Sequence, residues 1–101
     1  MGILVKFGDF LGRVFAMLVD PRDVLHRLPS PEDESFHIAN AIDWYDHTVL
    51  KSAQMPEFVQ ELDRVISQTK DEDDVRFLEV LRDLAMQCSR EPRFKLEFIG
   101  D

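Results

Sequence analysis

Two amphipathic stretches joined by a very short link constrain the fold of this chain more than any other feature. Residues 55–69 and 72–89 repeat apolar side chains every three or four positions, the spacing of an α-helix that buries one face. The sequence at the join, "TKDED", leaves room only for a reversal of direction. The apolar faces consist of Phe58, Val59, Leu62, Val65 and Ile66 in the first stretch and Val75, Leu78, Leu81, Leu84, Ala85 and Cys88 in the second. We therefore expect an antiparallel helical hairpin.

Alternating apolar residues near both termini predict β-strands. In the run "ILVKF" at residues 3–7 and in the run "FKLEFI" at residues 94–99, every second residue is apolar, so these side chains share one face of a strand. Further sheet residues are expected from 42–50. The predicted fold class is α+β: a small antiparallel sheet that includes the N- and C-terminal strands, packed against the helical hairpin and one or two further helices.

The segment between these elements contains two helix-start signals. Asp9 follows Gly8 and is placed to cap a helix over residues 10–18, whose apolar residues recur at spacings of one, three and four. Asp20 followed by Pro21 predicts a second, short helix over residues 21–28, with Val24, Leu25 and Leu28 directed inward.

The middle of the chain is harder to assign. Residues 29–35, "PSPEDES", combine two prolines with three consecutive acids and predict an exposed loop. Residues 36–53 fit either an irregular extended stretch or a short helix, because their periodicity does not discriminate between the two.

Length and composition indicate one soluble domain. The chain has 101 residues, of which 45% are hydrophobic and 32% charged, so it can bury one modest core over residues 1–101. The single cysteine, Cys88, excludes an internal disulfide and lies on an apolar helical face, where a thiol behaves as a small hydrophobe. A reducing, cytoplasmic location fits this pattern best.

The net charge of −8 limits the classes of partner. A chain this acidic is repelled by phosphate backbones and by anionic membranes, so we expect neither nucleic-acid nor membrane binding. No stretch reaches the ~18 uninterrupted apolar residues of a membrane span. The acidic excess is densest in residues 31–49, which hold five acids and no base. The same field attracts a basic protein partner.

The stretch "IDWYDHT", residues 42–48, concentrates reactive residue types. One reading is a metal or acid-base site, with His37, Asp43, Asp46 and His47 as candidate ligands. No pair of these has a strong ligand spacing, and the chain lacks a glycine-rich phosphate loop. We therefore expect no metal, no cofactor and no enzymatic activity.

Two other interpretations of residues 42–48 remain, and they are compatible: the stretch shapes a turn of the fold, or it binds a partner. The Asp46 carboxylate can accept the amide of Thr48 and form a turn. Of Trp44 and Tyr45, we expect one ring to be buried and one exposed among acids, as in a binding hot spot. The predicted partner-binding residues are Glu32, Asp33, Glu34, Asp43, Trp44, Tyr45 and Asp46.

The succession "IDWYDHTVL", then Gln54, then "EL" at 61–62 and finally "LEFIGD" at 96–101 resembles a group of small acidic bacterial proteins common in actinobacteria. The resemblance spans residues 42–101 and departs from the group's pattern at Leu50 and Lys51, where an aromatic residue and an asparagine are expected. It implies a small bacterial cytoplasmic protein. By analogy, it also suggests an immunity protein, which neutralises a toxin made beside it.

The leading functional hypothesis is a non-enzymatic immunity or inhibitor protein that neutralises a basic toxin or enzyme through an acidic face. The alternative is a structural subunit or homo-oligomer, in which the apolar run "FLGRVFAMLV" or the terminal strands complete a neighbour, because this run has few polar positions and could bury both faces. A metal-dependent enzyme is the third hypothesis.

Overall fold

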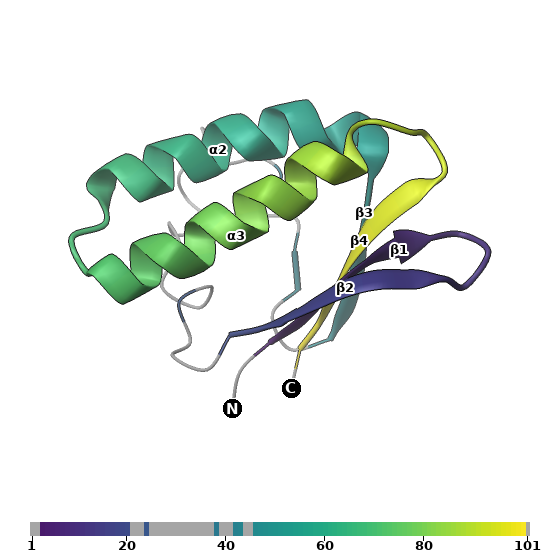
Figure 1. Cartoon of the computed structure of the whole chain (residues 1–101), viewed down its shortest axis with the longest axis horizontal. Coiled ribbons are helices and arrows are strands. Elements are labelled where there is room, and N and C mark those ends of the chain that lie inside the picture. Colours follow the sequence, from purple (N-terminus) through teal and green to yellow (C-terminus); the bar gives the residue numbers. More distant parts are fainter. Residues whose placement is uncertain (1–2, 21–23, 25–37, 39–41, 44–45, 101) are drawn as a thin grey trace.

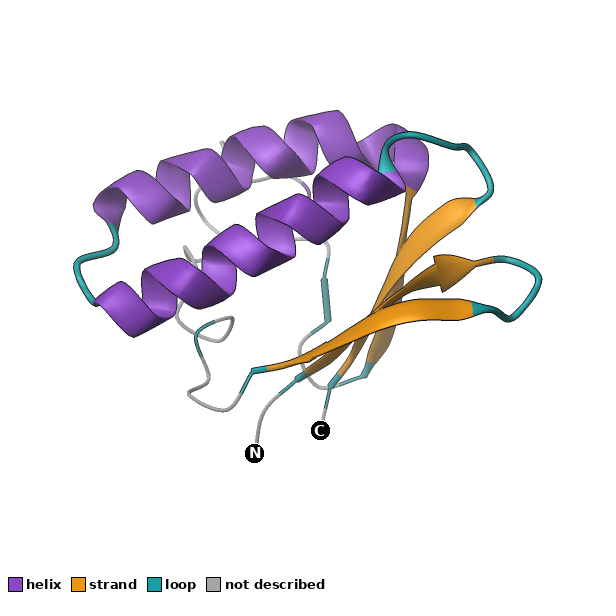
Figure 2. Cartoon of the chain, in the orientation of Figure 1, coloured by secondary structure: helices purple, strands orange, loops and turns teal. Residues whose placement is uncertain are grey.

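The computed structural model describes residues 3–20, 24, 38, 42–43 and 46–100. In this part of the chain, strands and helices follow one another in the order β1 (Leu4–Asp9), β2 (Val14–Val19), β3 (His47–Lys51), the 3-10 turn η2 (Ser52–Gln54), α2 (Met55–Gln68), α3 (Glu72–Cys88) and β4 (Phe94–Ile99). Helices α2 and α3 lie on the same side of the sheet (Figure 1, Figure 2), and the start of β1 lies beside the end of β4, where Leu4 aligns with Ile99. The predicted α+β fold class is confirmed.

Among the described residues, the sheet has four antiparallel strands in the order β2-β1-β4-β3. The two terminal strands, β1 and β4, are its central pair, and their register aligns Val5 with Phe98 and Phe7 with Leu96. These residues face the helices and are buried. Helices α2 and α3 leave the other face of the sheet open (Figure 2). Because successive side chains of a strand point to opposite faces, the residues that alternate with these four belong to the open face.

The helical hairpin is confirmed. Helix α2 begins with Pro56 in its first turn. The Asp71 carboxylate caps α3 by accepting the amides of Asp73 and Asp74, at 2.9 and 3.2 Å. The helices are further joined by an ion pair from Arg82 Nε to Asp63 Oδ1, at 2.5 Å. Their apolar faces meet the sheet, where the Phe58 and Phe98 rings pack edge to face with centroids 5.9 Å apart.

The predicted helix over residues 10–18 is wrong, because this segment forms a turn and strand β2. Asp9 does act as a cap, but of a turn: its Oδ1 accepts the amides of Leu11 and Arg13, both at 3.0 Å. Gly12 has φ 94°, which favours glycine and reverses the chain. A short apolar run fits the spacing of a strand as well as that of a helix. Its pairing with β1 therefore decided between the two.

Gly8 is required where the chain reverses. The register of β1 and β2 shifts between Phe7 and Gly8, so that Val14 rather than Phe15 aligns with Gly8. This shift is a β-bulge, and it brings the Arg13 carbonyl so close that a Cβ on Gly8 would overlap it.

The remaining sequence predictions have mixed outcomes. The helix over 21–28 and the loop over 29–35 lie outside the described residues, apart from Val24. That valine is buried as predicted, and its amide donates to Asp20 Oδ1 at 2.9 Å. Within 36–53, residues 47–51 form β3, which confirms the expected further sheet residues. No helix in the described part of the chain is long and apolar enough to cross a membrane.

Candidate functional site

Strand β2 exposes an unusual amount of apolar surface for the edge of a sheet. The exposed fractions are 50% for Val14, 48% for Phe15, 65% for Met17 and 59% for Val19. Phe10 and Leu11, in the preceding turn, are also exposed. We call these six residues the β2 surface. No residue of β2 is charged, so this edge offers a partner an apolar contact along its whole length.

Strand β2 is apolar on both of its faces. Met17 and Val19 align with Lys6 and Leu4 of β1 and lie on the open face of the sheet. Ala16 and Leu18 alternate with them, lie on the helix side and pack against the core while remaining partly exposed. A strand that is apolar on both faces is typical of strands that are covered on both sides, and the central strands β1 and β4 of this sheet carry charged side chains on the open face.

The backbone groups of β2 alternate in direction. The amide of Asp20 donates to the Ile3 carbonyl at 3.0 Å, so Asp20 and Ile3 form a hydrogen-bonded pair. In an antiparallel ladder such pairs alternate with non-bonded ones. Leu18 therefore bonds to β1, whereas the N–H and C=O groups of Met17 and Val19 point away from it. In the described part of the chain, β2 is an outer strand, and these groups form its free edge.

The opposite edge, strand β3, has a different character. It contains His47 and Lys51, and its exposed valine, Val49, is 36% accessible. Nε2 of His47 lies 2.8 Å from Oε2 of Glu97 on the neighbouring strand. Charged side chains on an outer strand discourage pairing with another chain. Strand β3 is protected in this way and β2 is not.

The open face of the sheet changes from apolar at β2 to charged at β4 and β3. Nζ of Lys95 lies 2.8 Å from Oε1 of Glu97, and Lys6 aligns with Glu97 on one side and Met17 on the other. The hydrogen bond from Lys95 lowers the pKa of the Glu97 carboxyl against the effect of partial burial, and His47 lowers it further. This carboxylate is therefore ionised at neutral pH. On the open face, the most exposed apolar side chains are those of β2, whereas Val49 on β3 is less exposed.

On the helix side, three aromatic rings form a shallow groove beside β2. The ring centroids of Phe7, Phe15 and Phe94 lie 5.3 to 5.4 Å apart. Gln87 and Arg90, from the end of α3 and just beyond it, complete the lining of a groove of about 230 Å³. Because Phe15 belongs to β2, the groove extends the β2 surface onto the helix side of the sheet.

Only two of the predicted partner-binding residues are described, and both are exposed acids. The Asp46 amide donates to the Asp43 carbonyl at 3.3 Å, so both residues belong to one turn before β3. The predicted bond from the Asp46 carboxylate to the Thr48 amide is wrong among the described residues. Instead, Thr48 Oγ1 accepts the Asp43 amide at 2.9 Å, because the strand already directs the Thr48 side chain back to the turn. Glu32, Asp33, Glu34, Trp44 and Tyr45 lie outside the described residues.

The chemical readings gain no support from the described residues. No group of three or more histidine, cysteine, aspartate or glutamate side chains is arranged to hold a metal ion there, and His37 lies outside them. Cys88 is fully buried, and burial raises the pKa of its thiol to about 12. At neutral pH this thiol is protonated, which makes it a poor nucleophile.

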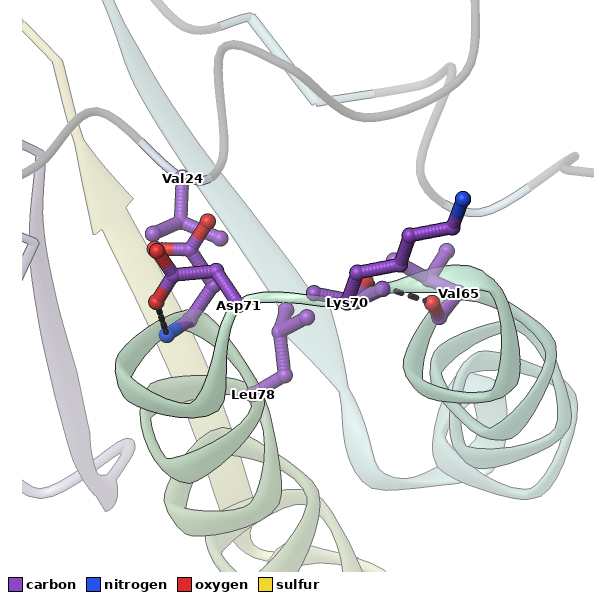
Figure 3. Close-up of a pocket in the computed structure, with 7 residues that line it drawn as sticks. Val24, Val65, Lys70, Asp71 and Leu78 are labelled. Atoms are coloured by element: carbon purple, nitrogen blue, oxygen red, sulfur yellow. Dashed lines mark hydrogen bonds between the residues drawn. The ribbon is translucent and has the colours of Figure 1, made fainter.

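A second pocket lies at the turn between α2 and α3 (Figure 3). Its volume is about 280 Å³, and it is lined by Val24, Val65, Thr69, Lys70, Asp71, Asp74 and Leu78. Asp71 caps α3, and Thr69 Oγ1 donates to the Val65 carbonyl at 2.7 Å. Lys70 extends its ammonium group away from Asp71 (Figure 3). The Asp71 and Thr69 groups thus complete helix ends, which gives this pocket a structural explanation.

Comparisons of the chain with protein families, with curated proteins and with solved structures gave no match. The resemblance to small acidic bacterial proteins therefore stays a prediction. The β2 surface was missing from the predicted partner-binding residues, although the uncharged run "VFAMLV" was a signal for it. From the sequence, this run was predicted to be part of a helix, and only the homo-oligomer alternative gave it a role in binding.

Proposed function

We propose that this chain is a cytoplasmic protein-binding domain that engages its partner through the β2 surface. The observation that carries the proposal is that β2 has the uncharged composition of a strand buried on both faces, yet in the described part of the chain it is exposed at the edge of the sheet. Exposed apolar patches on soluble proteins mark interaction sites, and unpaired strand edges are templates for pairing.

The geometry favours a partner that adds a β-strand. A flat surface or a single helix would cover one face of β2 and leave the other in water. An added strand places alternate side chains on both faces and also bonds to the outward groups of Met17 and Val19. Full burial of a valine or methionine side chain contributes ~1.5–3 kcal/mol, so these half-exposed side chains together can support a specific complex.

Replacing Val19 with lysine tests this proposal. We expect Val19→Lys to weaken partner binding by roughly ten-fold or more, because it removes an apolar contact and puts a charge on the pairing edge. The matched control is Val49→Lys, on the same face of the sheet but at the opposite edge. Partner recovered from the source cells by each immobilised variant is quantified against wild type. Equal recovery by all three proteins would contradict the proposal.

We propose a second function, compatible with the first: an immunity or inhibitor protein whose acidic face neutralises a basic toxin or enzyme. It is supported by the net charge of −8 and by the exposed acids Asp43 and Asp46 in one turn. This turn leads into β3, at the edge opposite β2, so the two surfaces are separate. Glu32, Asp33 and Glu34 would extend the acidic face.

Charge reversal tests the acidic face. The double variant Asp43→Lys, Asp46→Lys is expected to weaken binding to a basic partner by about ten-fold or more at low salt and less at high salt, because salt screens exposed charges. The control is Glu79→Lys with Asp83→Lys, which makes the same change in net charge on exposed positions of α3. Calorimetry at two salt concentrations measures both. Salt-independent binding, or equal loss in both variants, would rule out this face.

A further inference from the structure

We propose that the partner of the β2 surface is a second copy of this chain, joined by antiparallel pairing of the two β2 strands around a two-fold axis at Met17. The inference rests on the proposed function, since it names the occupant of the same site. The four described strands of each copy then form one continuous eight-stranded sheet. The helical hairpins of the two copies both lie on the same side of this sheet.

The absence of charge along β2 lets a second copy pair at this edge despite the net charge of −8. Strand β2 has no charged residue, so two copies bring no like charges together along the paired length. The exposed acids Asp43 and Asp46 adjoin β3, at the far edge of each sheet.

The backbone of β2 allows the pairing and selects its axis. A two-fold axis perpendicular to a sheet passes between the two paired strands, midway between the two copies of one residue, which therefore face each other. Met17 stands in the middle of the regular part of β2, beyond the bulge, and its N–H and C=O point outward. These two groups bond reciprocally to the C=O and N–H of Met17 in the second copy.

The side chains are complementary on both faces in this arrangement. On the helix side, Leu18 of one copy meets Ala16 of the other. On the open face, the two Met17 side chains meet, and Val19 meets the bulge at Val14 and Phe15. Every one of these contacts is apolar. The pairing is thus the arrangement that covers β2 on both faces with residues of the same kind.

The size of the interface sets the concentration at which the dimer is observed. A six-residue strand is about 20 Å long, and its pairing buries less than the roughly 800 Å² per partner of a standard stable interface. We therefore expect a dissociation constant on the order of micromolar. Sedimentation equilibrium from about 1 to 200 μM spans this range.

The test uses the charge of residue 17. Wild type is expected to have twice the 11.8 kDa chain mass at the upper concentrations. Met17→Glu places a carboxylate opposite Lys6 of its own chain, which stabilises the pairing of β1 and β2. In the dimer, however, the two introduced carboxylates would face each other across the two-fold axis and repel. Met17→Lys likewise sets two ammonium groups against each other. Each variant alone is expected to have the one-chain mass. The control is Val49→Lys, which places an ammonium group opposite Glu97 at the other edge of the sheet and is expected to retain the two-chain mass.

An equimolar mixture of Met17→Glu and Met17→Lys is expected to regain the two-chain mass, because opposite charges then meet at the axis. Only an interface in which residue 17 faces its own copy predicts this recovery. A wild-type protein with the one-chain mass throughout, or a mixture that stays at it, would overturn the proposed dimer. In that case the capture experiment with Val19→Lys separates two outcomes. If wild type captures a different protein that Val19→Lys fails to capture, only the identity of the partner is wrong. If the two capture the same proteins equally, the proposed function fails as well.

Discussion

Replacing Phe98 with alanine is expected to lower the free energy of unfolding by about 3–5 kcal/mol. Phe98 is fully buried in β4, a central strand of the sheet, and its ring packs edge to face on Phe58 of α2. Removing it leaves a cavity between the two layers and deletes the aromatic contact that joins them. Because a domain of this size is stabilised by only ~5–15 kcal/mol, the variant would lose a large part of its stability.

Urea denaturation followed by circular dichroism measures this loss, and Phe10→Ala is its control. Phe10 is the same residue type but is 53% exposed in the turn before β2, where its ring lies 5.2 Å from Nζ of Lys95. We expect this substitution to cost no more than about 0.5–1 kcal/mol. If the two substitutions cost the same, Phe98 does not lie in the core that the structure assigns to it.

Replacing Gly8 with alanine is expected to cost roughly 2–3 kcal/mol and to disrupt the β2 surface as well. The new methyl group would overlap the Arg13 backbone carbonyl, which cannot swing away as a side chain can. That carbonyl accepts the Asp9 amide at 3.0 Å, so relieving the overlap opens the turn and shifts β2 against β1. Stability and partner binding should therefore fall together.

Gly12→Ala is the matched control for this prediction. Gly12 has φ 94°, which strains an alanine, but nothing lies within 4 Å of the added methyl group. The expected cost is about 1 kcal/mol. Denaturant titrations of the two variants give the comparison. If Gly8→Ala left the free energy of unfolding unchanged, the turn would have space for a methyl group, contrary to the structure.

The helical hairpin and the terminal strands were predictable from local patterns. The stripe of α2, the acids and cap of α3 and the alternation of β4 each depend on residues fewer than twenty positions apart. Such patterns do not depend on how the elements are arranged in space, because a helix or strand buries its apolar side in every fold.

Residues 10–19 show why the rest could not be predicted. Their apolar side chains suit a helix as well as a strand, and an acid after glycine caps either a helix or a turn. Pairing with β1 and the reversal at Gly12 favoured the strand, and both depend on partners brought together by the fold. The acidic candidates were recognisable by charge alone. The uncharged run "VFAMLV" is also visible in the sequence, but its position at the edge of the sheet depends on the strand order.

The sequence by itself determined the α+β class, the helical hairpin, the terminal strands and a net charge that repels phosphate backbones, because these follow from composition and short-range periodicity. The tertiary structure decided that β1 and β4 are central, that "VFAMLV" is a strand, and that this strand stands uncovered at one edge. Strand order and exposure depend on contacts between distant residues. No pattern within a single segment records them.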